Sequence, residues 1–161
     1  MAHVDMFLKV QTARQGVIKG ESKDLTHGQE IDVINWSWGL RAHTDMSGIG
    51  ASAKADIDEL EIIKHVDSAS TALMAAVRNN DPIKTATLTI RKAGGGKALE
   101  YVKITVEDAR VTLLHVESEE EALIERLKIA FKKVSVEYVP QAADGSAMGS
   151  MSFETEIGSD S

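Results

Sequence analysis

The sequence predicts a mainly β protein with one α-helix. Most of the chain alternates apolar and polar residues with a period of two, which is typical of a strand with one buried face. β-Branched residues are frequent in these alternating runs, and such residues favour strands. A single short run, Ser70–Arg78, instead carries helix-forming residues between polar segments that can begin and end a helix.

A strand that contains both tryptophans follows the first alternating run, residues 4–10. Because side chains alternate along a strand, one face would carry Ile34, Trp36, Trp38 and Leu40. Such an apolar stripe either nucleates a core or forms a contact surface. Large aromatic side chains on an apolar strand face are usually buried, so we expect these four residues in the structural core.

The next predicted elements are a strand within 57–66 and the helix. Leu60 and Ile62 share one parity in that strand. The helix Ser70–Arg78 follows a lead-in rich in Asp and Ser, which are preferred N-cap residues. It is expected to stop at the Asn-Asn-Asp-Pro run of residues 79–82, because proline does not continue a helix.

A glycine triplet, residues 94–96, separates two long alternating runs and predicts a hairpin turn. In the run before it, Ala86, Leu88 and Ile90 lie opposite a face of Thr85, Thr87 and Thr89. In the run after it, the apolar positions change from even (Val102, Ile104, Val106) to odd (Val111, Leu113). A bulge or break is therefore expected within 107–110, since an uninterrupted strand would turn its apolar face outward there.

Residues 119–134 fit two structures. Leu123, Leu127 and Phe131 have helical spacing, and nearby Glu–Lys pairs would support a helix. Leu127, Ile129 and Phe131 also alternate as in a strand, and the alternation resumes with opposite parity at Val134. The local pattern leans slightly to helix in the first half. A last strand is expected over residues 150–157.

Composition bounds the class of protein. The 161 residues fit one domain, residues 1–157, followed by a disordered tail, residues 158–161. The net charge of −7, with basic residues spread among acidic ones, argues against nucleic acid as a partner. No run approaches the ~18 apolar residues of a membrane span, and the N-terminus lacks the pattern of a signal peptide. The chain has no cysteine, and we expect it to be made and folded in the cytoplasm.

No motif predicts catalysis, a cofactor or a metal. The five histidines are scattered without ligand spacing, and there is no nucleophile elbow. Residues 48–53 match a degenerate dinucleotide fingerprint but lack the strand–turn–helix context. The acidic residues Asp56, Asp58, Glu59 and Glu61 could attract a cation, although their alternation with apolar residues favours a solvated strand face. We therefore expect a protein that is not an enzyme.

Several sequence blocks, in order along nearly the whole chain, resemble the haemolysin-coregulated protein (Hcp) family of the type VI secretion system. The front half carries KGESKD (19–24), TH (26–27), EIDV (30–33) and WSWG (36–39). The second half carries LTIRKAGG (88–95), EYV (100–102), ITV (104–106), VEYVPQ (136–141) and DG (144–145). Jointly these blocks are specific, whereas one of them alone would not be.

The resemblance implies a closed antiparallel β-barrel of two sheets with one flanking helix, the predicted Ser70–Arg78. It also implies that residues 119–138 are strand, against the local helical pattern. Family members form hexameric rings that stack into a tube, and a contractile sheath propels this tube, tipped by a spike protein. They are secreted without a cleaved signal peptide after assembly in the cytoplasm, and they carry effector proteins in the ring lumen.

The resemblance also places a ring-stacking loop directly after the tryptophan strand. This segment is rich in small residues, and a long exposed loop in a compact domain is often functional. The expected stacking residues are Thr44, Asp45, Met46, Ser47, Gly48, Ile49, Gly50, Ala51, Ser52, Ala53 and Lys54. Two alternatives remain open: a monomeric β-barrel that binds a small ligand, and an effector protein on the same barrel.

Overall fold

The computed structural model describes residues 5–44, 53–93 and 98–157, which form twelve strands and one helix. The predicted mainly β architecture with a single helix is thus confirmed. Before the helix come β1 (Asp5–Thr12), β2 (Gly16–Ile18), β3 (Ile31–Asp32), β4 (Asn35–Ser37), β5 (Leu40–Thr44), β6 (Ala53–Ile57) and β7 (Leu60–His65). The helix is α1 (Ser70–Arg78), followed by β8 (Ile83–Ala93), β9 (Ala98–Glu119), β10 (Ala122–Ala130), β11 (Lys133–Tyr138) and β12 (Met151–Glu156).

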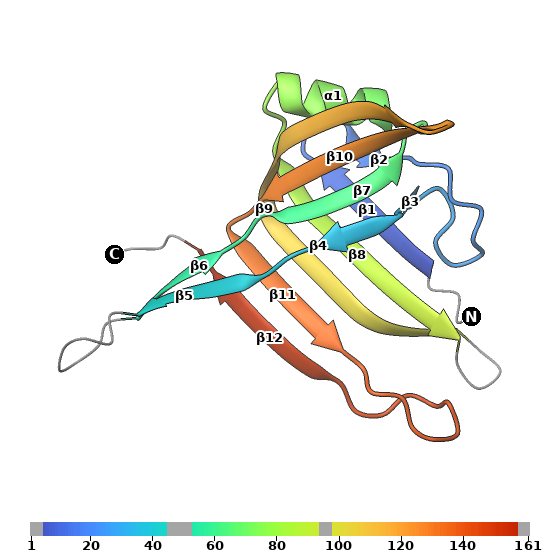
Figure 1. Ribbon diagram of the computed structural model, residues 1–161, viewed down its shortest axis with the longest axis vertical. Coiled ribbons are helices and arrows are strands. Elements are labelled where there is room, and N and C mark those ends of the chain that lie inside the picture. The colour runs from blue at the N-terminus through green and yellow to red at the C-terminus, as the bar shows by residue number, and fades with distance from the viewer. Residues whose placement is uncertain (1–4, 45–52, 94–97, 158–161) are drawn as a thin grey trace.

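The strands divide into a ten-stranded antiparallel sheet and a separate ribbon of β5 and β6 (Figure 1). In the large sheet the order is β2-β1-β8-β9-β10-β7-β4. Three strands lie off this path: β3 pairs with β1, β11 pairs with β9, and β12 pairs with β11. The first half of β9 pairs with β8 and β11, and its second half pairs with β10. The long strand β9 therefore carries the sheet from one layer of the molecule into the other.

The predicted bulge or break in this long strand is confirmed as a break in the regular strand backbone at Asp108, whose φ is +51°. Ile104 and Val106 are buried before it, and Ala109 and Val111 are buried after it. The left-handed backbone at Asp108 thus accompanies the change of parity of the buried face, where β9 changes partners. The predicted turn at residues 94–96 lies outside the described residues, although the strands that flank it pair as a hairpin, with Ala93 opposite Ala98.

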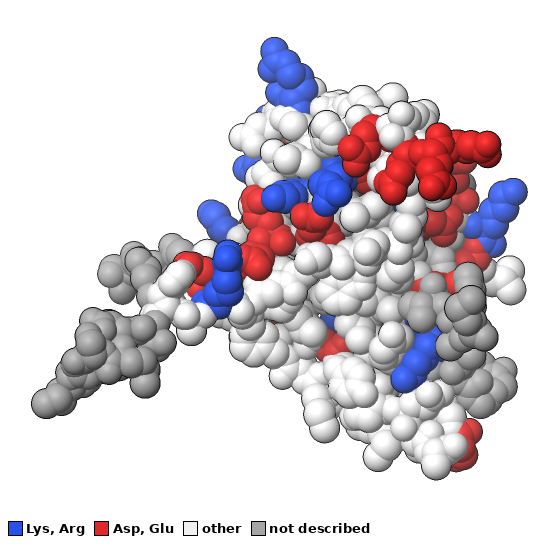
Figure 2. Space-filling view, in the orientation of Figure 1, with Lys and Arg blue, Asp and Glu red and all other residues white. Residues whose placement is uncertain are grey.

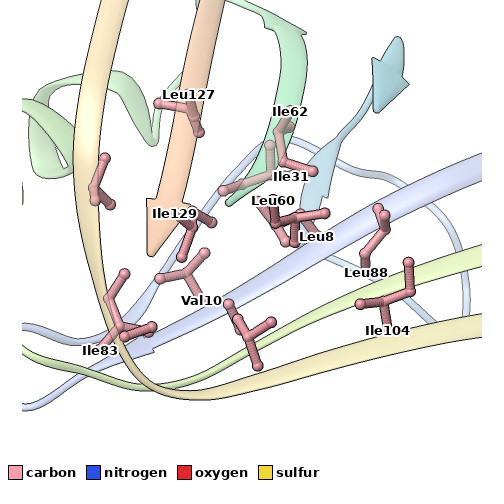
Figure 3. Close-up of a cluster of buried hydrophobic side chains, with 14 of the residues drawn as sticks. Leu8, Val10, Ile31, Leu60, Ile62, Ile83, Leu88, Ile104, Leu127 and Ile129 are labelled. Carbon is pink, nitrogen blue, oxygen red and sulfur yellow. The ribbon is translucent and has the colours of Figure 1, made fainter. Parts of the chain in front are cut away.

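The core fills the space between the two layers (Figure 3). Side chains of β1 and β8 point toward those of β7 and β10, and Leu8, Leu60, Leu88 and Leu127 are fully buried there. Each buried leucine or isoleucine contributes roughly 1.5–3 kcal/mol through removal from water. The period-two patterns of Leu8 and Val10, of Leu60 and Ile62, and of Leu88 and Ile90 each have their apolar face in this core, as predicted.

The closed barrel is not confirmed, because the pairing order of the large sheet is open, with β2 at one end and β4 at the other. One segment, residues 31–37, nevertheless contacts both layers. Its β3 pairs with β1, and its β4 pairs with β7. Between these strands Val33 donates its backbone N–H to the carbonyl of Met6 at 3.0 Å, and Ile34 donates to Ile63 at 2.8 Å.

The predicted helix is confirmed with the same bounds, and it packs against β9. Its buried residues are Ser70, Leu73 and Ala76, which share one face by their spacing of three. The expected side-chain N-cap is wrong, because Ala69 occupies the cap position. Asp67 instead accepts a hydrogen bond from the Ala69 N–H at 3.0 Å, which tightens the turn before the helix. No helix in the described parts of the chain is long and apolar enough to cross a membrane.

Residues 122–130 form the strand β10, so the helical lean of the local pattern is wrong and the structure implied by the family resemblance is correct. Leu127 and Ile129 are buried at alternate positions, whereas Leu123, which belonged to the helical pattern, is exposed. The pairing of β10 with both β7 and β9 decides the outcome, because a strand placed between two others satisfies its backbone groups on both sides.

The tryptophan stripe is corrected in part. Trp36 and Trp38 are partly buried and pack against the core, whereas Ile34 and Leu40 are 41% and 48% exposed in the single chain. The expected continuous strand is interrupted, since β4 ends at Ser37 and β5 begins at Leu40 in a different sheet. The interruption breaks the shared face on which the core assignment of Ile34 and Leu40 rested.

Candidate assembly surfaces

The ribbon of β5 and β6 projects from the body of the molecule (Figure 1). Its strands pair from Leu40 opposite Ile57 to Thr44 opposite Ala53. Two exposed ion pairs cross it, Arg41–Asp58 at 3.0 Å and His43–Asp56 at 2.6 Å. Exposed pairs contribute at most about 1 kcal/mol each, so the ribbon is held mainly by its backbone hydrogen bonds. A ribbon that projects in this way offers both of its faces for contact with another molecule.

The two described ends of the predicted ring-stacking loop lie at the far end of this ribbon. Thr44 ends β5, and Ala53 and Lys54 begin β6. The central residues of the loop, 45–52, lie outside the described residues. The two ends of the predicted loop are therefore adjacent, at a distance from the core.

The acidic residues near the ribbon are paired. Asp56 and Asp58 form the two ribbon ion pairs, Glu61 pairs with Arg126, and Glu59 accepts a hydrogen bond from Thr112 Oγ1 at 2.9 Å. Within the described ranges, no group of three or more His, Cys, Asp or Glu side chains is placed to hold a metal ion.

A cavity of about 400 Å³ lies at the base of the ribbon. Its lining is Ser37, Trp38, Ile57, Asp58, Glu59, Glu61 and Lys128. A carrier of a small ligand needs a mostly apolar pocket that encloses the ligand. This cavity is lined mainly by polar and charged side chains, so it does not resemble such an apolar pocket.

A second surface lies on the ribbon of β11 and β12. On its inward face Val134 belongs to the core, Val136 is partly buried, and Tyr138 is exposed. The cross-strand partners on the same face are Phe153 opposite Val136 and Met151 opposite Tyr138. Met151 is 65% exposed and Phe153 is 47% exposed, so the apolar face continues past the edge of the core.

This apolar face also lies at an edge, because β12 pairs with β11 alone among the described strands. Exposed apolar side chains on an edge strand favour association with another chain. The local sequence pattern indicates a strand at 150–157 but no role for its apolar face. Apolar Met151 and Phe153, two positions apart, were the available signal.

Acidic side chains gather at the opposite end of the molecule, over the turn between β9 and β10 (Figure 2). The exposed residues there are Glu117, Glu119, Glu120 and Glu121. Like charges at this end disfavour contact with the same end of another copy.

The fold is that of a type VI secretion system protein. A solved structure titled as a type six secretion system protein superposes with a TM-score of 0.84, at 24% identity and with 96% of both chains covered, which shows the fold. The crystal structure of Hcp1 from Salmonella typhimurium gives a TM-score of 0.73 at 29% identity, with 98% of this chain and 96% of that chain covered.

Sequence similarity then defines the family. A family model described as "Type VI secretion system effector, Hcp" matches residues 7–138. Protein hcp1 of Pseudomonas aeruginosa is 39% identical over 150 residues, which cover 91% of this chain and 90% of that protein. The chain belongs to the Hcp family of the type VI secretion system.

Proposed function

We propose that residues 1–157 form a single domain that is the structural subunit of a type VI secretion inner tube. Six subunits form a ring, the rings stack, and the tube is secreted with effector proteins carried in its lumen. The observation that carries this proposal is the family match over residues 7–138 together with 39% identity to Protein hcp1 across nine-tenths of the chain. The role is structural, without a catalytic step or a cofactor.

Two surfaces support the proposal. The apolar face of β11 and β12 suits a contact between neighbouring subunits of a ring, because burying Met151 and Phe153 removes them from water. The β5–β6 ribbon suits a contact between stacked rings, because it projects from the body and carries the predicted loop, residues 44–54.

The proposal includes closure of the barrel. Segment 31–37 hydrogen-bonds to β1 through Val33 and to β7 through Ile34, and it would close the sheet between these two strands. A closed sheet leaves fewer unpaired edges, so that association would concentrate on the remaining edge at β12.

The partners follow from the tube. They are other copies of the chain, a spike protein at the tip, the contractile sheath, and effector proteins in the lumen. Neither nucleic acid nor membrane insertion belongs to the proposal. Assembly takes place in the cytoplasm, and export with the tube needs no cleaved signal peptide.

The solution mass of the purified protein tests the proposal, combined with negative-stain electron microscopy. Light scattering on a gel-filtration column should give six times the 17.4 kDa of the chain, and the images should show rings. A stable monomer at micromolar concentration would overturn the tube proposal and favour the barrel that binds a small ligand. A single-subunit mass with toxicity to a recipient cell would instead favour the effector alternative.

A further inference from the structure

A loop between β2 and β3, residues 20–30, folds back on itself and is called here the 20–30 loop. Gly20 donates its N–H to the carbonyl of Gln29 at 2.7 Å, and Ser22 donates to Glu30 at 3.0 Å. Gln29 donates in return to Ser22 at 2.8 Å. At the far end of this loop, Leu25 is fully exposed to solvent. The loop therefore presents an apolar side chain whose position depends on how the loop is fastened to the sheet.

One attachment of the loop to the sheet is the ion pair between Asp24 and Arg91 on β8. Its guanidinium donates to both carboxylate oxygens of Asp24, at 3.0 Å and 2.6 Å, and to Asp5 at 2.8 Å. Asp24 also accepts the backbone N–H groups of Thr26 and His27. These contacts lower the pKa of Asp24, chiefly through the hydrogen bond from Arg91, so the pair remains charged at every pH near neutrality.

His27 provides the other attachment of the loop to the sheet. Its ring stacks on Phe7 of β1, with centroids 4.6 Å apart and planes 9° apart. Its Nδ1 lies 2.9 Å from Oε2 of Glu30 in the same loop, and its Nε2 lies 2.6 Å from Oε1 of Glu100 on β9. The side chain of His27 is only 11% exposed, so water competes poorly for either nitrogen.

This geometry requires a proton on both ring nitrogens. An ionised carboxylate only accepts hydrogen bonds, whereas a neutral imidazole donates from one nitrogen and accepts at the other. A neutral His27 would therefore direct a lone pair at one of the two carboxylates. The imidazolium alone donates to both Glu30, within the loop, and Glu100, on β9, and its contact with Glu100 joins the loop to β9.

We propose that His27 is a proton-operated clasp: its imidazolium ties the 20–30 loop to β9, and loss of the proton releases that tie. The charged groups around the clasp are Glu30 and Asp24 in the loop, Asp5 on β1, Arg91 on β8, and Glu100 and Lys103 on β9. Release leaves the Arg91–Asp24 pair in place, so the loop loosens at its His27 side and stays attached at the other.

The electrostatics agree with the direction of the switch. Burial lowers the pKa of His27, but the hydrogen bonds to Glu100 and Glu30 outweigh it, and the pKa is raised above the usual 6.5. Because the pKa of His27 is higher in the folded than in the unfolded protein, its contribution to the free energy of unfolding is fully present below about pH 6.5. That stabilisation is lost as the pH rises through the raised pKa. All of these groups lie in one chain, so the clasp goes beyond the tube proposal and does not depend on it.

Hydrogen exchange measured by mass spectrometry tests the clasp in the full-length protein. Exchange of the imidazole Cε1–H between pH 5 and 9 reports the titration of each histidine, and His27 should titrate above 6.5. Amide protection of residues 20–30, corrected for the intrinsic rate, should fall between pH 6 and pH 9. Glu100→Gln should move both midpoints to lower pH.

Two variants make the result specific. His27→Gln should remove the pH dependence of amide protection in residues 20–30 and leave protection of the core strands unchanged. His115→Gln replaces an exposed histidine outside the loop and should behave as the wild type. The proposal is overturned if His27 is neutral at pH 6, or if loop protection is the same at pH 6 and 9. It is equally overturned if His27→Gln retains the wild-type pH dependence. Ring formation plays no part in these readouts, so they are separable from failure of the tube proposal.

Discussion

At the scale of single residues, a lysine occupies the core. Lys64 on β7 is fully buried, and its Nζ lies 2.8 Å from Oδ1 of Asp67 and 3.2 Å from Oε1 of Glu125. Ser70 at the start of α1 accepts a further hydrogen bond from it at 3.2 Å. Glu125 on β10 is also fully buried. This cluster therefore joins two strands to the beginning of the helix through buried charges that depend on one another.

Replacing Lys64 with Met is expected to lower the free energy of unfolding by about 3–5 kcal/mol, because it leaves Glu125 as a buried charge without its cation. The double variant Lys64→Met/Glu125→Leu should recover most of this loss, since it removes both charges. Urea unfolding at one fixed protein concentration measures the effect. Lys84→Met, at an exposed position on β8, is the matched control. Equal stability of Lys64→Met and the control would contradict the expectation.

Gly20 allows the two ends of the 20–30 loop to cross closely. A Cβ at this position would lie 2.6 Å from the carbonyl oxygen of Glu30 and 2.8 Å from the Cα of Ile31. Gly20→Ala should destabilise the protein by about 1–3 kcal/mol, because backbone atoms must move to accommodate the methyl group. Gly149→Ala, where nothing lies within 4 Å, should change the melting temperature little. Thermal unfolding of the two variants, compared side by side, gives the answer.

At the scale of elements, the two ribbons have separate roles in the proposed assembly. Among the residues of the β5–β6 ribbon whose burial the structure describes, none is fully buried, whereas the β11–β12 ribbon shares Val134 with the core and extends beyond it. Substitutions in the β5–β6 ribbon should leave the rest of the domain folded. Substitutions on the exposed face of the β11–β12 ribbon should weaken association between subunits more than they weaken folding.

Replacing residues 44–54 with a short turn should leave rings intact and prevent tube growth and secretion. The two described ends of the replaced segment, Thr44 and Ala53, pair at the end of the β5–β6 ribbon that projects from the body, so we expect the fold of the subunit not to depend on this segment. Electron microscopy of the purified variant and detection of the protein in culture supernatant measure the two outcomes. Tubes of normal length in the variant would refute a stacking role for this segment.

The double variant Met151→Asp/Phe153→Asp should convert rings to monomers, because it places two charges on the apolar face of β12. Ser152→Asp adds a charge to the same strand on its opposite face and should retain the ring mass. Gel filtration with light scattering separates the two results. Rings that persist in the double variant would assign the ring contact to a different surface.

At the scale of the whole molecule, paired charges link stability to pH. The hydrogen bond from Arg91 holds the pKa of Asp24 well below its usual 3.8. Burial raises the pKa of Asp32, and the carboxylates of Asp67 and Asp5 raise it further. The two aspartates therefore affect the pH dependence of stability in opposite directions. Acid weakens the stabilisation that ionised Asp24 provides, whereas it removes the unfavourable buried charge of Asp32 and its repulsion by neighbouring carboxylates.

Stability from Asp24 should be fully present above about pH 4 and decline as the pH falls further, because its folded pKa is depressed below the unfolded value of 3.8. Asp24→Asn should therefore flatten the decline in melting temperature between pH 5 and pH 2. Gly149→Ala, which changes no titratable group and has nothing within 4 Å, serves as the control and should keep the wild-type slope. Calorimetry across this range tests the prediction, and parallel curves for wild type and Asp24→Asn would contradict it.

Local patterns were sufficient for much of the fold. Alternation predicted the inward faces of β1, β7 and β8, and the change of parity placed a bulge or break within 107–110, where Asp108 has a left-handed backbone. The helix bounds followed from its flanking polar residues. The lean to helix at 119–134 was wrong because the spacing of Leu123, Leu127 and Phe131 also fits a strand, and pairing with β7 and β9 is not local information.

The sequence by itself determined the family, the strand faces and the single helix, because these depend on residue order and on periods of two and 3.6. Tertiary structure alone decided which residues meet across long separations. It exposed Ile34, which lies between β3 and β4, and Leu40, which begins β5 in a different sheet, and it buried Lys64 beside Glu125. It also brought His27 to Glu100, 73 residues away. Such contacts depend on strand pairing between distant segments, and no local pattern of side chains encodes that pairing.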